Sequence, residues 1–193
     1  PELLSPAFRD LLMRTGSMLD TAIPYDPASI RATPLPPPQA AIADEVRDIA
    51  IGYGIHRIEV LVSGVLGHVA VAASAHPPTV VLGQALLTAD QPDVRTYLIH
   101  RAMKVIQANA VVFARTAPID LWPLLAAYLK CFTPGWNPQG VDATRLTNFY
   151  GRLSRAVPAG LPHDTGALAA EIIGSIGNRA PTLNTAVNGW GDR

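Results

Sequence analysis

The run of residues that says most about the fold of this chain is Tyr97-Leu98-Ile99-His100-Arg101-Ala102-Met103-Lys104-Val105-Ile106. The run sits in a segment that we predict to be a helix from Pro92 to Phe113, with proline at its start, where a missing N–H group is harmless. A helix places His100 and Lys104, four positions apart, on one face. The residues just before it, Thr79 to Leu82, are predicted to form a strand. The centre of the chain therefore predicts a strand, a short connection and a helix.

Two more strands are predicted upstream of this centre. Arg57 to Val62 and Val69 to Ala72 are rich in branched apolar residues, and a turn region with Gly64 and Gly67 separates them. Three strands so close together predict a small three-stranded sheet, antiparallel or mixed. Because the rest of the chain has helical character, we predict an α+β fold in which this sheet packs on a mainly helical domain.

The remaining helices are predicted from spacing and capping residues. Asp142 and Asp164 are candidate N-caps, and Gly52 and Gly54 end the helix that precedes the sheet. The helices are expected at residues 8–19, 39–51, 118–131, 142–156, 165–177 and 183–188.

Three segments are expected along the chain. Residues 1–23 form an N-terminal helix, and residues 24–38 contain six prolines, which favour an extended linker or arm. Residues 39–193 form the α+β domain. The chain starts without Met and stops abruptly at Trp190-Gly191-Asp192-Arg193, so we expect a truncated piece of a larger, multidomain protein.

Composition narrows the classes of protein. Hydrophobic residues make up 49% of the chain and charged residues 16%, which favours a packed globular domain whose apolar surface is partly covered by partners. The net charge is zero and no basic run occurs, so a nucleic-acid partner is not expected. No apolar run has the length of a membrane span. One cysteine, Cys131, excludes an internal disulfide and favours a reducing, cytoplasmic location.

The central region resembles the gluzincin zinc peptidases, in particular the CAAX-prenyl-endopeptidase family and its soluble relatives. There, a strand precedes a helix with the pattern His-Glu-x-x-His, and a later helix carries a Glu-x-x-Ala-Asp-Arg segment. The likeness covers about Leu66 to Ile106 and returns at the end of the chain, Asn188-Gly189-Trp190-Gly191-Asp192-Arg193. It implies a zincin-like fold.

The residues that the resemblance aligns with the zinc site differ in chemistry. His100 matches the first ligand, but Arg101 stands at the general base and Lys104 at the second ligand. Asn188 stands at the third, glutamate ligand, and Asp192 at the aspartate. An ammonium repels a dication, and a guanidinium stays charged and accepts no proton. We therefore expect no bound metal, no cofactor and no catalytic residue, which makes the chain a pseudoenzyme. Alternatively, the likeness is coincidental and His100 is a partly buried structural histidine.

The other histidines, the cysteine and two tryptophans are expected to have structural roles. The remaining histidines do not stand at metal-ligand spacing with Cys, Asp or Glu and are expected on surfaces or turns. Cys131 follows Lys130, which favours a lowered thiol pKa, but a half-buried inert thiol, unpaired with His100, is the simpler reading. We expect Trp122 in the core and Trp136 packed on the domain from a Pro/Gly loop. The histidines are His56, His68, His76 and His163.

Three function classes remain open. The first is a non-catalytic interaction or scaffold domain whose former cleft, with its strand edge and the cations Arg101 and Lys104, accepts an acidic, extended segment. The second is a zinc-independent hydrolase that uses His100 with a carboxylate from Glu59, Glu171 or Asp192. The third is a structural helical module that packs against neighbouring domains or forms an oligomer. We favour the first class.

Overall fold

The computed structural model describes residues 5–88, 91–158, 161 and 165–176. They fall into two compact units. The sheet unit comprises residues 24–111, and the helical unit comprises residues 1–23 together with 112–193. The helical unit is thus built from both ends of the chain. The division at residue 23 coincides with the start of the proline-rich stretch, whereas the sequence carries no signal for the return at residue 112.

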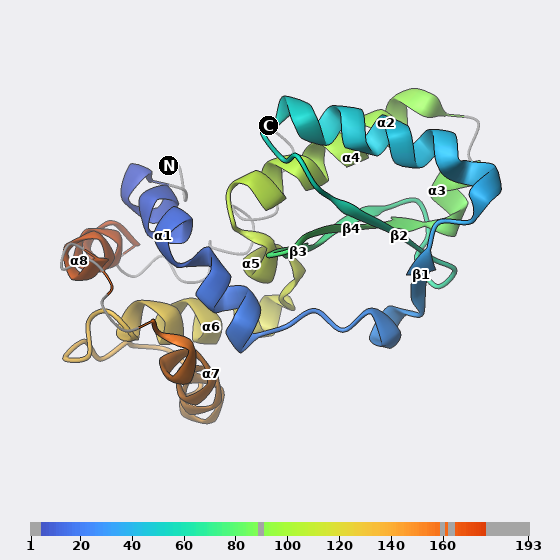
Figure 1. Cartoon of the computed structure of the whole chain (residues 1–193). Coiled ribbons are helices and arrows are strands. Elements are labelled where there is room, and N and C mark those ends of the chain that lie inside the picture. Colours follow the sequence, from blue (N-terminus) through green and yellow to red (C-terminus); the bar gives the residue numbers. More distant parts are fainter. Residues whose placement is uncertain (1–4, 89–90, 159–160, 162–164, 177–193) are drawn as a thin grey trace. The chain divides into compact units, whose positions relative to one another are not determined.

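The sheet unit contains a four-stranded mixed sheet with the order β1-β2-β4-β3 (Figure 1). The strands are β1 (Ala32–Pro34), β2 (Glu59–Ser63), β3 (Ala70–Ala75) and β4 (Pro78–Gly83). Strands β2 and β4 are parallel, with Leu61 opposite Val81. Strands β1 and β3 run antiparallel to their neighbours and form the two edges. The α+β class and the mixed sheet agree with the sequence analysis.

The predicted three-stranded sheet is wrong in its number of strands. The fourth strand, β1, comes from the proline-rich stretch, where Ala32 pairs with Ser63 and Pro34 with Leu61. Proline has no N–H to donate to the hydrogen-bond ladder of a sheet, but it is tolerated on an edge strand. The prolines of this stretch argued against a strand, so β1 was not predicted from the sequence. The hydroxyl of Ser63 also donates to the carbonyl of Ile30 at 2.5 Å, which ties the segment to β2.

Apolar side chains cover both faces of the sheet. Leu61, Ala73 and Val81 form a buried cluster, against which Tyr25, Ile30, Ala32 and Leu66 pack. Because side chains alternate along a strand, Val60, Val62, Val80 and Leu82 point to the opposite face and are also buried. Figure 1 shows α2 (Ala40–Gly52) and α4 (Pro92–Gln107) along one side of the sheet.

Helix α4 is shorter than predicted. The expected helix at 92–113 ends at Gln107, and a short helix, α5 (Val111–Arg115), follows. Asn109 lies between them with a φ of 54°, a left-handed conformation that asparagine adopts more readily than most residues and that an α-helix cannot contain. Its Oδ1 atom lies 2.8 Å from Nε2 of His76. A second short helix, α3 (Gln84–Thr88), directly follows β4.

The helical unit contains α1 (Pro6–Ala22), α6 (Pro118–Lys130), α7 (Ala143–Ala156) and α8 (Thr165–Ile176). An aromatic cluster lies in its core. The rings of Phe8, Phe113 and Phe132 have centroids 6.5, 5.6 and 5.3 Å from that of Tyr128, which is fully buried. Tilted and edge-on pairs at these distances stabilise a core beyond the burial of their area. The contacts of the Phe8 ring with this cluster thus hold the N-terminal helix α1 in the core of the helical unit.

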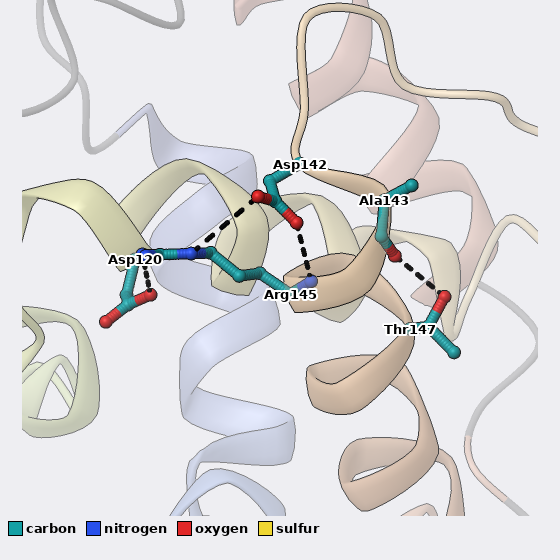
Figure 2. A network of polar contacts seen from close by, with 5 residues as sticks. All are labelled: Asp120, Asp142, Ala143, Arg145 and Thr147. Carbon is teal, nitrogen blue, oxygen red and sulfur yellow. Dashed lines mark hydrogen bonds and ion pairs between the residues drawn. The ribbon is translucent and has the colours of Figure 1, made fainter.

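Asp142 caps α7, as the sequence predicts. Its Oδ1 accepts from the backbone N–H of Arg145 at 2.9 Å, and the Arg145 side chain reaches Oδ1 of Asp120 on α6 at 2.6 Å (Figure 2). The same guanidinium lies 3.9 Å from Oδ2 of Asp142. One arginine therefore joins the start of α7 to α6.

Two expected features cannot be compared with the structure. The N-cap Asp164 and the helix at 183–188 lie outside the described residues. Among the helices of the described residues, none combines the length and the apolar composition that crossing a membrane would require.

Candidate functional site

Helix α4 carries the residues that the sequence analysis singled out. Its inner face, with Ile99, Met103 and Ile106, is buried, whereas Tyr97 and His100 are exposed and Arg101 and Lys104 are half-buried. Tyr97, His100 and Lys104 follow one another at intervals of three and four residues, so they form one stripe along the helix. We call these three residues the α4 stripe.

The ring of His100 is held by a tyrosine from the end of α2. The hydroxyl of Tyr53 lies 3.1 Å from Nδ1 of His100, and the ring centroids are 5.7 Å apart. Gln107, one helical turn beyond Lys104, donates from Nε2 to the backbone carbonyl of Tyr53 at 2.9 Å. The sequence shows Tyr53 only as the residue between two helix-ending glycines, so no local signal could have identified this contact.

A second polar contact joins α2 to α4 further back. Glu45 accepts from Arg95 at 3.0 Å through Oε2 and from Thr96 at 2.9 Å through Oε1. Both α2–α4 contacts join residues that are 47 to 54 positions apart in sequence. Since the separation stays nearly constant, the two helices run parallel and side by side.

Lys104 occupies the position that the resemblance gives to a second zinc ligand. Its ammonium has no carboxylate partner among the residues that the structure describes. Arg101, the residue at the general-base position, already interacts with another group of the chain. The α4 stripe therefore presents an aromatic ring, an imidazole and a free cation along about two turns of helix.

Nothing in the described part of the chain gathers ligands for a metal ion. No group of three or more His, Cys, Asp or Glu side chains lies close enough within residues 5–88, 91–158, 161 and 165–176. Asn188 and Asp192 lie outside these residues, so their placement near His100 stays a prediction.

A hydrolase that uses His100 requires a neighbouring carboxylate. In the described residues, the polar partner of the imidazole is the Tyr53 hydroxyl. Glu59 instead accepts from Oγ1 of Thr79 at 3.4 Å on the sheet, and Glu171 belongs to α8 of the helical unit. The sheet unit thus brings His100 together with a tyrosine, not with the carboxylate Glu59 that was expected as its partner.

The edges of the sheet offer little backbone to an added strand. Five of the six residues of β3 are buried, and only Val71 is partly exposed. The opposite edge, β1, has three residues and includes Pro34. Short, proline-bearing edge strands are typical devices against further pairing.

The remaining candidates have structural roles. Burial raises the pKa of the Cys131 thiol to about 11, and its Sγ lies 3.3 Å from the carbonyl of Ala127, so the lowered pKa considered from sequence is wrong. Trp122 is half-buried, contrary to the expected core position. Its indole N–H donates to the carbonyl of Gln139 at 3.2 Å, and its ring lies edge-on to that of Trp136 at 6.3 Å. His56, His68 and His76 are exposed, and His163 and Trp190 lie outside the described residues.

Comparisons of the chain with known protein families, with curated proteins and with solved structures find no match.

Proposed function

We propose that this chain is a non-catalytic protein-interaction module, which uses the α4 stripe to bind a carboxylate-bearing segment of a protein partner in the cytoplasm. The observation that carries the proposal is Lys104, a half-buried residue whose ammonium has no acidic partner in the described residues. A cation left without an acidic partner, on a helix face that also carries an exposed tyrosine, is typical of a surface that pairs with another molecule.

The order of elements supports a peptidase-like origin for this surface. Helix α2 precedes β2, the edge strand β3 runs antiparallel to β4, and β4 leads through α3 to α4. This is the strand-to-helix order on which the resemblance to gluzincin peptidases rests. In that setting Lys104 replaces a metal ligand by a cation, and Arg101 replaces the general base. The site positions then favour recognition of an anion over catalysis.

The burial of β3 favours one of two possible ways of binding. Strand addition needs an open row of backbone donors and acceptors, and β3 is mostly buried. The α4 stripe is instead reached from solvent, and Tyr97 is 50% exposed. We therefore place the partner on the outer side of α4.

Binding of a fluorescent, glutamate-rich peptide to the whole chain tests the proposal. We expect binding that weakens between low salt and about 0.5 M salt, because ions screen exposed charges. Lys104→Glu should reduce the affinity at least about tenfold, since it replaces attraction by repulsion. Arg9→Glu, which makes the same charge change at an exposed position of α1, should leave it unchanged.

A metal analysis completes the test. Purified chain should contain no stoichiometric zinc and should not hydrolyse peptides. Stoichiometric zinc together with hydrolysis that His100→Ala abolishes would overturn the proposal, as would equal peptide binding by the wild type and Lys104→Glu.

A further inference from the structure

The outer face of the α2–α4 pair carries acidic residues on α2 and in the first turn of α4, and a cation in the last turn of α4. On α2, Asp44 and Asp48 are exposed, and on α4 the exposed Asp93 lies in the first turn. Toward the other end lie Lys104 and the contact between Tyr53 and His100. Arg47 neutralises part of the acidic end, because its Nη1 lies 2.7 Å from Oδ1 of Asp44. Asp48 has no such partner among the described residues.

The parallel helices fix where these charges lie. With a separation of 47 to 54 positions between facing residues, Asp48 lies level with about residue 98 of α4. Lys104 therefore lies about six residues, or roughly 9 Å, further along the helix axes. Ile51 is level with the midpoint between them and is 56% exposed. Tyr97 adds an exposed aromatic ring to the same face and is 50% exposed.

Such a face is complementary to itself. Consider a twofold axis that lies in the plane of the face, midway between Asp48 and Lys104 and perpendicular to the line that joins them. Rotation about this axis places Asp48 of one copy opposite Lys104 of the other. Each dimer then contains two identical Asp48–Lys104 pairs, with Ile51 and Tyr97 in the contact. We propose that the partner of the α4 stripe is a second copy of this chain, bound in this isologous arrangement. The inference rests on the proposed function, since it names the source of the carboxylate.

The size of the face predicts a weak dimer. Helix α2 has 13 residues, which is about 20 Å of length, and two adjacent helices are about 20 Å wide. The footprint is thus roughly 400 Å² for each copy, about half of the ~800 Å² that a standard interface buries for each partner. We expect association at high micromolar concentration, weakened by salt.

Reciprocal charge reversals test the twofold contact. Sedimentation of the whole chain up to about 1 mM should show a monomer–dimer equilibrium. Lys104→Glu and Asp48→Lys should each lower the association constant at least about tenfold, because each variant would form two like-charged pairs. An equimolar mixture of the two variants should recover wild-type association, since one pair is wild type and the other is reversed. Arg9→Glu and Asp10→Lys on α1 serve as controls for the charge changes.

Several outcomes would overturn the inference, namely a wild type that stays monomeric at about 1 mM, single variants that associate like the wild type, or a mixture without recovery. If a reversed variant does not fold by circular dichroism, Lys104→Ser and Asp48→Asn replace the pair, and both should weaken association. A monomeric wild type that binds the glutamate-rich peptide through Lys104 would reject the second copy and keep the proposed function. A monomeric wild type without peptide binding would reject both.

Discussion

The hydroxyl of Tyr128 lies 2.6 Å from Oγ1 of Thr15, which joins α6 to α1 in the fully buried core of the helical unit. The Thr15 hydroxyl also donates to the carbonyl of Leu11 at 2.7 Å. The Thr15 hydroxyl has only one proton, and the carbonyl of Leu11 accepts it, so the Tyr128 hydroxyl must be the donor in its bond to Thr15. A neutral phenol fits this chain of hydrogen bonds, whereas a phenolate does not. Desolvation by burial raises the pKa of Tyr128 well above its usual value and outweighs the opposing effect of Thr15.

We expect the helical unit to lose stability in alkali. Below the ordinary tyrosine pKa of about 10, Tyr128 is neutral in both the folded and the unfolded chain, so its contribution is fully present. Above pH 10 the unfolded chain ionises first, and stability falls as the pH rises toward the folded-state pKa. Urea unfolding of the wild type between pH 8 and 11 should show this decline. Tyr128→Phe should remove part of the decline, and an unchanged slope would contradict the assignment to Tyr128.

Removal of the same hydroxyl should cost stability at neutral pH. Tyr128→Phe keeps the ring among Phe8, Phe113 and Phe132 but deletes the hydrogen bond to Thr15, so we expect a loss of about 1–2 kcal/mol in the free energy of unfolding. Tyr150→Phe, at a half-buried position of α7, is the control and should change it by less than about 0.5 kcal/mol. Equal effects of the two variants would show that the buried hydrogen bond is not a net stabilising contact.

The thiol of Cys131 should react slowly in the folded chain. Burial raises its pKa from 9.0 to about 11, so the thiolate fraction at pH 8 falls by roughly tenfold to a hundredfold. Modification by a disulfide reagent should therefore be slower than in urea by at least this factor. The raised pKa also makes the stability of the fold depend on pH. The free energy of unfolding should decrease above pH 9, because the thiol ionises first in the unfolded chain. Native and unfolded rates that match would contradict the burial of the thiol.

The cap of α7 should be measurable by substitution. Asp142→Ala removes the acceptor for the N–H of Arg145 and one of the two carboxylates near its guanidinium, so we expect a loss of about 1 kcal/mol. Asp142→Asn keeps a capping oxygen and should cost less, which separates the cap from the charge. Chemical unfolding of the three proteins gives the comparison, and equal losses for both variants would assign the whole effect to charge.

Local patterns in the sequence predicted most helices and the three central strands. Asp142 caps its helix as expected, and prolines begin α4 and α6. Such features depend on residues that are close together in the sequence, so they can be predicted from the sequence alone. The shared helix face of His100 and Lys104 also followed from their spacing of four residues.

Features that depend on residues far apart in the sequence could not be predicted from it. Strand β1 has three residues and a proline, and only its pairing with β2 makes it a strand. The break after Gln107 needs the left-handed Asn109, which also contacts His76, 33 positions away. Tyr53 holds His100 across 47 positions. In each case tertiary contact, rather than local propensity, determines the structure.

Gly83 at the end of β4 gives the sharpest test of the sheet unit. A Cβ atom there would lie 1.8 Å from the carbonyl oxygen of Gly67 and 2.8 Å from that of Leu66, both of which belong to the backbone between β2 and β3. The backbone N–H of Gly83 donates to the carbonyl of Val69 at 2.9 Å, so the strand cannot move away without losing this bond. The close approach therefore requires glycine.

We expect Gly83→Ala to destabilise the chain by at least about 2 kcal/mol, because the loop must shift and break contacts with the edge of the sheet. Gly52→Ala is the matched control in the same unit. A Cβ atom at Gly52 meets nothing within 4 Å, so its effect should stay within about 0.5 kcal/mol. Thermal and urea unfolding of both variants would decide. If Gly83→Ala unfolds like the wild type, the loop at residues 66–69 does not pack against the end of β4 as described, and the connection from β2 to the edge strand takes another path.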